Sequence, residues 1–131
     1  MVVLPGREDS ERGAASTQLV LVTPVLILMV MLIIQFGLWY HGSHVAIAAA
    51  QEGARAARLE GGSAMAGEDR ARMFLGALGR EVVGEAQVVA SRGPDVARVE
   101  VSGVSVAVVP GFRLPIHAVS EANVERFRAP A

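Results

Sequence analysis

The chain divides into one continuous apolar stretch and a longer region in which apolar and polar residues are mixed. Residues 19–40 read LVLVTPVLILMVMLIIQFGLWY, and no Asp, Glu, Lys or Arg occurs anywhere between Arg12 and Glu52. At a rise of about 1.5 Å per residue, a helix over this run reaches roughly 33 Å, which is enough to cross the hydrocarbon core of a bilayer. The pattern therefore predicts a membrane-spanning helix over residues 14–40, the first few of which form its entrance.

Two other interpretations of this run are disfavoured. A buried helix of a soluble domain would need a core that covers it on all sides, and a chain of 131 residues is too short to provide one. A cleaved secretory signal normally has an apolar region of about 7–15 residues followed by a small-residue cleavage site. Here the run is longer and ends in Trp39 and Tyr40, which are typical of a membrane interface. We therefore expect the segment to be retained.

The helix is expected to continue through residues 41–60, where small residues share one helical face at i, i+3 and i+4 spacing. Such a stripe lets another element approach closely, whether that element is a sheet or a neighbouring helix. The stripe consists of Ala46, Ala49, Ala50, Gly53, Ala54 and Ala57. Within the apolar run, the Gln35 amide is expected to bond either to a neighbouring helix or to its own helix backbone.

After residue 60 the pattern changes from helical to alternating. Gly61 and Gly62 supply a helix stop, and Ser63 is a candidate N-cap for a second helix over residues 64–83. Beyond Gly84 the alternation predicts strands. We expect them at residues 87–91, 96–109 and 113–120, with the tail at residues 122–131 as a candidate short edge strand.

The middle strand contains an irregularity. Its apolar positions move from the odd-numbered Val99 and Val101 to the even-numbered Val104 and Val106. Because successive side chains of a strand point to opposite faces, this change predicts a β-bulge at Gly103. The expected fold class is α+β, in which a long N-terminal helix leads into a second helix and a three- or four-stranded antiparallel sheet.

Composition removes several classes of function. The net charge is −1, so no general attraction to nucleic acid is expected, and the absence of cysteine removes disulfides, thiol nucleophiles and thiolate metal sites. His41 and His44 are spaced three apart, but no carboxylate lies nearer than Glu52, which favours a polar interfacial face over a metal site. Neither a nucleophile elbow nor a phosphate-binding glycine motif is present. We expect no enzyme activity, no cofactor or metal, and no small-molecule substrate.

The start of the chain has its own signature. A short charged leader ends in Gly13, and the apolar helix follows almost at once. This arrangement resembles the signal of type IV pilin-like proteins, in which a membrane prepilin peptidase cuts after the glycine. The resemblance implies a leader over residues 1–13, a cut between Gly13 and Ala14, and an uncut helix that becomes the stem of the mature subunit.

Further elements sharpen this resemblance. The sequence RGAA at residues 12–15, Pro24 within the apolar helix, FGLWY at residues 36–40 and AAQEGARAA at residues 49–57 are similar to the TadE-like family of tight-adherence pilus proteins. The similarity extends to about Arg128, and the first fifty residues of that span carry most of its specificity. At the fifth residue after the presumed cut, family members usually have glutamate, whose carboxylate is thought to pair with the new N-terminal amine of an adjacent subunit. Here the residue is Gln18, which supplies no charge.

The expected protein is a structural, pilin-like subunit, with a priming or tip role as the favoured variant. Arg7 and Arg12 precede the span and only Arg55 follows it closely, which favours a cytoplasmic N-terminus and an extracytoplasmic module over residues 41–131. The expected partners are the inner membrane, the prepilin peptidase and other pilin-like subunits. The alternative is an uncleaved single-pass component of a larger envelope assembly, and only the pilin-like interpretation requires a cut after Gly13.

Overall fold

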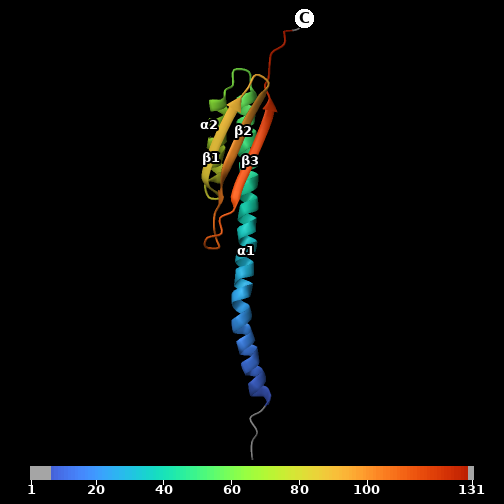
Figure 1. Ribbon diagram of the computed structural model, residues 1–131, viewed down its shortest axis with the longest axis vertical. Helices are drawn as coiled ribbons and strands as arrows, with labels where there is room; N and C mark the ends of the chain where they lie inside the picture. Colours follow the sequence, from blue (N-terminus) through green and yellow to red (C-terminus); the bar gives the residue numbers. More distant parts are fainter. Residues whose placement is uncertain (1–6, 130–131) are drawn as a thin grey trace, which may run out of the picture. The chain divides into compact units, whose positions relative to one another are not determined.

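The computed structural model describes residues 7–129 of the chain. The elements follow the α+β order that the sequence predicts (Figure 1). They are helix α1 (Arg7–Arg58), helix α2 (Ala64–Phe74), the short π-helical segment η1 (Leu75–Gly79), and strands β1 (Val83–Arg92), β2 (Val96–Ser105) and β3 (Pro115–Asn123). The chain divides between Ile34 and Gln35 into an N-terminal unit and a C-terminal unit.

The N-terminal unit consists of the first part of α1. All of its described side chains from residue 11 to residue 30 are exposed. The hydroxyls of Thr17 and Thr23 donate to the carbonyls of Gly13 and Leu19, at 2.9 Å and 2.7 Å, so these two polar side chains are satisfied within the helix. Pro24 also lies inside the helix, where it removes one backbone donor. Residues 1–6 of the predicted leader lie outside the described residues.

The C-terminal unit begins with the second part of α1, and α1 ends where the sequence predicts. Gly61 adopts a φ of 76°, a left-handed conformation that suits glycine, and the Gly62 amide donates to the Leu59 carbonyl at 2.8 Å. Ser63 caps the next helix by accepting a 3.0 Å hydrogen bond from the Ala66 amide. The two helices are therefore joined by a tight connection.

The second helix is shorter than the predicted residues 64–83. Regular α-helix stops at Phe74, η1 follows to Gly79, and β1 begins at Val83. A side chain on Gly79 would lie 3.1 Å from Leu75 Cδ2 and 3.2 Å from Val45 Cγ1. The chain thus approaches α1 closely at Gly79.

The sheet is an antiparallel meander in the order β1-β2-β3. Val88 of β1 pairs with Val101 of β2, and Val101 pairs with Ala118 of β3, so three apolar residues line up across one face. This face packs on the helices, while the opposite face carries polar and charged residues between exposed valines. The strands alternate as expected for a sheet covered on one side only.

The predicted bulge lies on a different strand. The β2–β3 register is regular through Gly103, whereas β1 shifts between Gly84 and Gln87, opposite Gly103. A Cβ on Gly103 would lie 2.8 Å from the Gly84 carbonyl oxygen, so glycine makes room for the bulge of its neighbour. The inward positions of β2 accordingly stay odd, ending in Ser105, and the predicted switch to Val106 is wrong because Val106 is 40% exposed.

The tail does not add an edge strand within residues 124–129. Instead, the Val124 amide donates to the Asp95 carbonyl at 2.8 Å, and the Glu125 amide donates to the Arg58 carbonyl at 2.9 Å. These bonds hold the start of the tail beside the end of α1. The described sheet therefore has three strands.

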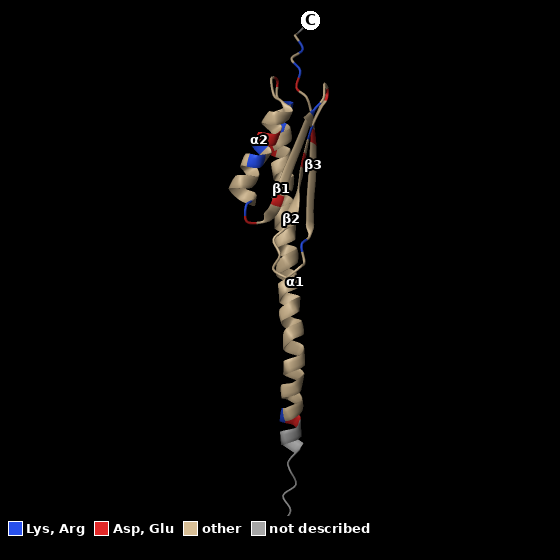
Figure 2. Cartoon of the chain, turned by 60° about the vertical axis from the view of Figure 1, so that its left-hand side comes forward, with Lys and Arg blue, Asp and Glu red and all other residues tan. Residues whose placement is uncertain are grey.

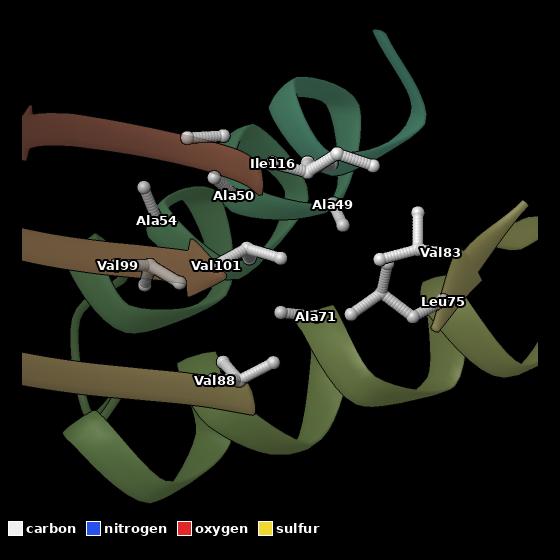
Figure 3. Packing of buried hydrophobic residues seen from close by; sticks show 12 residues of the cluster. Ala49, Ala50, Ala54, Ala71, Leu75, Val83, Val88, Val99, Val101 and Ile116 are labelled. Carbon is white, nitrogen blue, oxygen red and sulfur yellow. The ribbon is translucent and has the colours of Figure 1, made fainter. Parts of the chain in front are cut away.

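The core lies between the sheet and the two helices (Figure 3). Most of the α1 contribution is alanine, and the larger groups come from the sheet and from Leu75 of η1. Small side chains on α1 bring its backbone close to the strands, so that short valines can fill the layer. The buried cluster includes Ala46, Ala49, Ala50, Ala54, Ala71, Leu75, Val83, Val88, Val99, Val101, Ile116 and Ala118.

Candidate functional site

The described part of the N-terminal unit presents an apolar surface. Apolar side chains from Leu19 to Ile34 are largely exposed, and the α1 helix contains an 18-residue window with a mean hydropathy of 2.8. Figure 2 shows the same absence of charge along α1 between Arg12 and Glu52. By length and composition, this helix is suited to cross a membrane.

The predicted processing residues lie on this same helix. Gly13 and Ala14 are exposed, and no atom lies within 4 Å of where a Gly13 side chain would be. The bond between them lies within the helical backbone of α1. Glycine makes unwinding easier, since it costs a helix about 1 kcal/mol relative to alanine.

Gln18 is also exposed on α1. A neutral amide can accept a hydrogen bond from an ammonium group but contributes no ion pair. Gln18 lies five residues after Gly13, so it is at least one helical turn beyond the predicted new N-terminus. Its side chain makes no hydrogen bond to another of the described residues.

The small-residue stripe is covered by the chain's own elements. All six residues are buried, and the closest approach is at Gly53, where α1, α2 and β2 meet. An added Cβ at Gly53 would lie 2.7 Å from the Gly67 carbonyl oxygen, 3.0 Å from Ala71 Cβ and 3.1 Å from Val99 Cγ1. Of the two coverings that the sequence left open, the sheet and α2 of the same chain are the ones observed.

Two further glycines make close contacts that the sequence did not reveal. A side chain on Gly42 would meet Ile116 Cδ1 at 2.8 Å, and one on Gly67 would meet the Gly53 carbonyl oxygen at 2.8 Å. Gly42 lies one helical turn before Ala46, so extending the small-residue stripe backwards would have found it. Gly67 gives no comparable signal, because its helix is predicted only from a cap and a pattern.

Gln35 bonds to neither of the two partners that the sequence suggested, which were a neighbouring helix and its own helix backbone. It is fully buried, and its amide holds the connection between β2 and β3. Its Nε2 donates to the Val106 carbonyl at 2.9 Å and to Ser105 Oγ at 3.1 Å, while its Oε1 accepts from the Val108 amide at 2.7 Å. A long-range contact explains the polar residue in the apolar run, and such a contact leaves no local pattern in the sequence.

Trp39 makes a second polar contact to the same region. Its indole Nε1 donates to the Pro115 carbonyl at 2.9 Å, at the start of β3, and the ring packs against the core. Tyr40 and His44 form an edge-on aromatic pair with centroids 4.4 Å apart, and both are exposed. Polar and aromatic side chains are thus concentrated where the apolar run of α1 ends.

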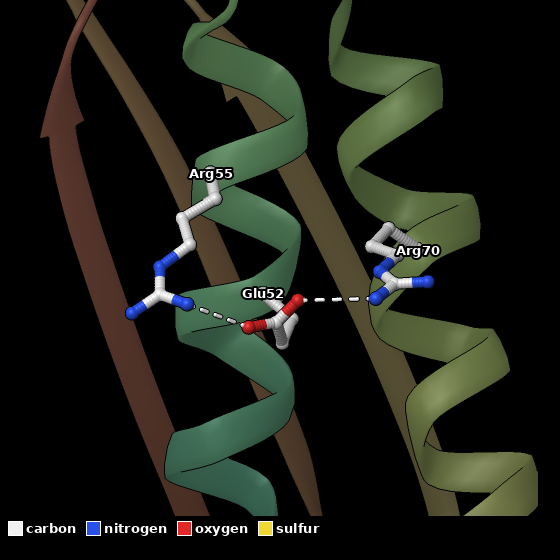
Figure 4. A network of polar contacts seen from close by, with 3 residues as sticks. All are labelled: Glu52, Arg55 and Arg70. Carbon is white, nitrogen blue, oxygen red and sulfur yellow. Dashed lines mark hydrogen bonds and ion pairs between the residues drawn. The ribbon is translucent and has the colours of Figure 1, made fainter.

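A surface ion-pair network links α1 to α2 (Figure 4). Glu52 accepts from Arg55, three residues later on the same helix, at 2.9 Å, and also from Arg70 of α2 at 3.2 Å. All three side chains are at least partly exposed, so each pair contributes little to stability. We interpret the network as a link between the two helices rather than as a catalytic site.

Other charged and imidazole groups are dispersed. His41 and His44 are both exposed on α1. Within residues 7–129, no group of three or more His, Cys, Asp or Glu side chains is placed to hold a metal ion. On the open face of the sheet, the Arg98 guanidinium donates a hydrogen bond to Glu121, and this bond and the nearby negative charges of Glu121 and Glu100 raise the pKa of Arg98 above its ordinary value.

Together these features define a class of protein. It has one N-terminal helix suited to span a membrane, and the second part of that helix packs through a small-residue stripe within a small α+β unit. Residues 13–55 match the family model of TadE-like protein, which confirms the resemblance that the sequence predicted. The similarity covers this segment of α1 and leaves α2 and the sheet outside it. No curated protein and no solved structure matches the chain.

Proposed function

We propose that the protein is a pilin-like structural subunit of a tight-adherence pilus or a related secretion system. In this proposal the apolar run of α1 at residues 19–40 spans the inner membrane. The N-terminus lies in the cytoplasm, and the module that follows the span lies outside it. The observation that carries the proposal is the exposed, uncharged part of α1 that follows directly after Gly13, within the segment that matches the TadE-like family. Its role is assembly through helix contacts rather than catalysis.

Processing by a prepilin peptidase is the step that distinguishes this function from its alternative. The cut between Gly13 and Ala14 would release the charged leader and leave an amine at the start of the apolar helix. The exposure of this bond and the weak helix propensity of glycine support the proposal. The alternative, an uncleaved single-pass component of an envelope assembly, requires no such cut.

The test is the intact mass of the membrane-extracted protein from cells with and without a cognate prepilin peptidase. The expected mature chain begins at Ala14 only when the peptidase is present. Gly13→Leu should block the cut, whereas Gly37→Leu should not, since Gly37 is another glycine of α1 with open space around its Cα. A chain that keeps residues 1–13 beside the active peptidase would favour the uncleaved alternative.

A low-copy priming or tip position is the finer form of the proposal. A subunit inside a fibre gains from a carboxylate that pairs with its neighbour's amine, because a buried, unpaired charge is costly. Gln18 cannot form that ion pair, and a tip subunit has no neighbour ahead of it that would need one. If glutamine were simply tolerated, lateral helix packing would supply the assembly energy instead.

Counting subunits in purified pili by quantitative mass spectrometry separates these possibilities. We expect a few copies per fibre, with the number raised by Gln18→Glu and unchanged by Gln51→Glu, an exposed glutamine on the same helix. A copy number equal to that of the major fibre protein would contradict the tip role. It would leave the pilin-like assignment in place.

A further inference from the structure

The loop between β2 and β3 is unusually apolar for an exposed connection. This loop, residues 106–114, reads VAVVPGFRL, and no charged residue occurs between Glu100 and Arg113. Val106 is 40% exposed and Phe112 is 37% exposed. Exposed apolar residues that cluster in one loop are typical of a surface that contacts another protein or a membrane.

The position of the loop indicates its partner. It packs on α1 at Gln35 and Phe36, where the rings of Phe36 and Phe112 meet edge-on with centroids 6.4 Å apart. Both α1 residues belong to the uncharged run at residues 19–40 that is suited to span a membrane. The loop is therefore held beside the last turns of that run, and the Phe36 ring next to it is itself 51% exposed.

Backbone groups of the loop have hydrogen-bond partners within the chain, as a poorly hydrated environment requires. Gln35 binds the Val106 carbonyl at 2.9 Å and the amides of Val108 and Val109 at 2.7 Å and 3.3 Å. At the tip, the Phe112 amide donates to the Val109 carbonyl at 3.0 Å. Irregular backbone near a bilayer needs such internal partners, because water is scarce there.

The tip is a tight turn whose residues fit its geometry. Proline occupies the second position, and Gly111 follows with a φ of 76°, as a type II turn requires. The first charge after the tip is Arg113, which pairs with Glu85 at 2.9 Å, and both side chains are well exposed. The apolar tip thus ends at a solvated ion pair.

We propose that the β2–β3 loop inserts into the headgroup and acyl boundary of the extracytoplasmic leaflet beside α1. Val106, Pro110 and Phe112 form the inserted surface, and the Glu85–Arg113 pair marks the level of the aqueous phase. Trp39 and Tyr40 lie at the end of the same run, as expected for residues at this interface. This contact gives the C-terminal unit a second attachment to the membrane, and it rests on the proposed membrane span of α1.

The chain has no cysteine, so single-cysteine labelling tests the depth directly. The full-length protein is labelled with the fluorophore NBD at Ala107→Cys in the loop, at Ser91→Cys in β1 and at Ile27→Cys in α1. Each variant is reconstituted into phosphatidylethanolamine and phosphatidylglycerol vesicles that contain lipid with a nitroxide near the headgroup. Quenching by the nitroxide and by aqueous iodide is then compared.

The expected result is strong nitroxide quenching and little iodide quenching at residue 107, with the reverse at residue 91. Iodide access at residue 107 equal to that at residue 91 would overturn the proposal. Protection from both quenchers would also overturn it, in favour of a covering protein. If residue 27 is also accessible to iodide, the membrane span itself fails, which separates failure of the proposed function from failure of this inference.

A matched pair of substitutions adds a second readout. Phe112→Asp should at least halve the nitroxide quenching at residue 107, because it places a charge at the inserted surface. Val119→Asp, at a valine of the open sheet face that is 40% exposed, should leave it unchanged. Equal quenching in both variants, with unchanged circular dichroism, would show that the loop does not enter the lipid.

Discussion

Replacing Gln35 with methionine should loosen the β2–β3 loop while leaving the volume of the side chain almost unchanged. Methionine has a similar length and flexibility but cannot form the amide's hydrogen bonds. The Val106 carbonyl and the Val108 amide would lose partners at 2.9 Å and 2.7 Å. Ser105 Oγ would still accept a hydrogen bond from the Leu114 amide at 3.2 Å, so it would keep one partner.

The size of the effect follows from these contacts. Leaving a buried donor or acceptor unsatisfied costs about 1–3 kcal/mol. The Gln35 contacts to the loop backbone are only partly buried, so water can replace some of what is lost. For the two main-chain groups with the shorter bonds, at Val106 and Val108, we expect a loss of about 2–3 kcal/mol in the free energy of opening this loop.

Hydrogen exchange measured by mass spectrometry on the detergent-solubilised full chain can detect this loss. At about 1.4 kcal/mol for each factor of ten, exchange in residues 105–114 should be roughly 30- to 140-fold faster. Gln51→Met serves as the control, because Gln51 is exposed on the same helix, and it should change stability by less than about 0.5 kcal/mol. Equal exchange in the two variants would refute the view that Gln35 holds the loop.

Three further predictions concern the helix contacts, and urea or thermal unfolding of the full chain in detergent checks each one. Gly53→Ala should destabilise by about 1–3 kcal/mol through its close backbone contact with α2, whereas Gly76→Ala, with open space around it, should be neutral or slightly stabilising. Ala54→Leu should also cost about 1–3 kcal/mol through overpacking, and unchanged stability would show that the stripe tolerates added volume. Glu52→Gln should cost less than about 1 kcal/mol, with the difference shrinking at high salt, and a larger loss would mean that the ion-pair network matters more than its exposure indicates.

The sequence determined the elements whose causes are local. An uncharged run long enough to cross a bilayer has few other uses, so the apolar part of α1 follows from residues 19–40 alone. The end of α1 and the start of α2 follow from Gly61 and Ser63, because a left-handed glycine and an N-cap serine act within one turn of backbone. The i, i+3 and i+4 spacing of small residues likewise identified the face of α1 that is buried.

Only the tertiary structure decided what those faces and side chains contact. A small-residue stripe suits a sheet or another helix equally well, and the chain's own sheet and α2 cover it at Gly53. The bulge lies in β1 rather than at Gly103, because the parity of one strand does not report which partner carries the extra residues. Gln35 bonds to a loop some seventy residues later, and no local pattern encodes a contact of that separation. Each of these outcomes depends on which elements meet, which a pattern along a single segment does not specify.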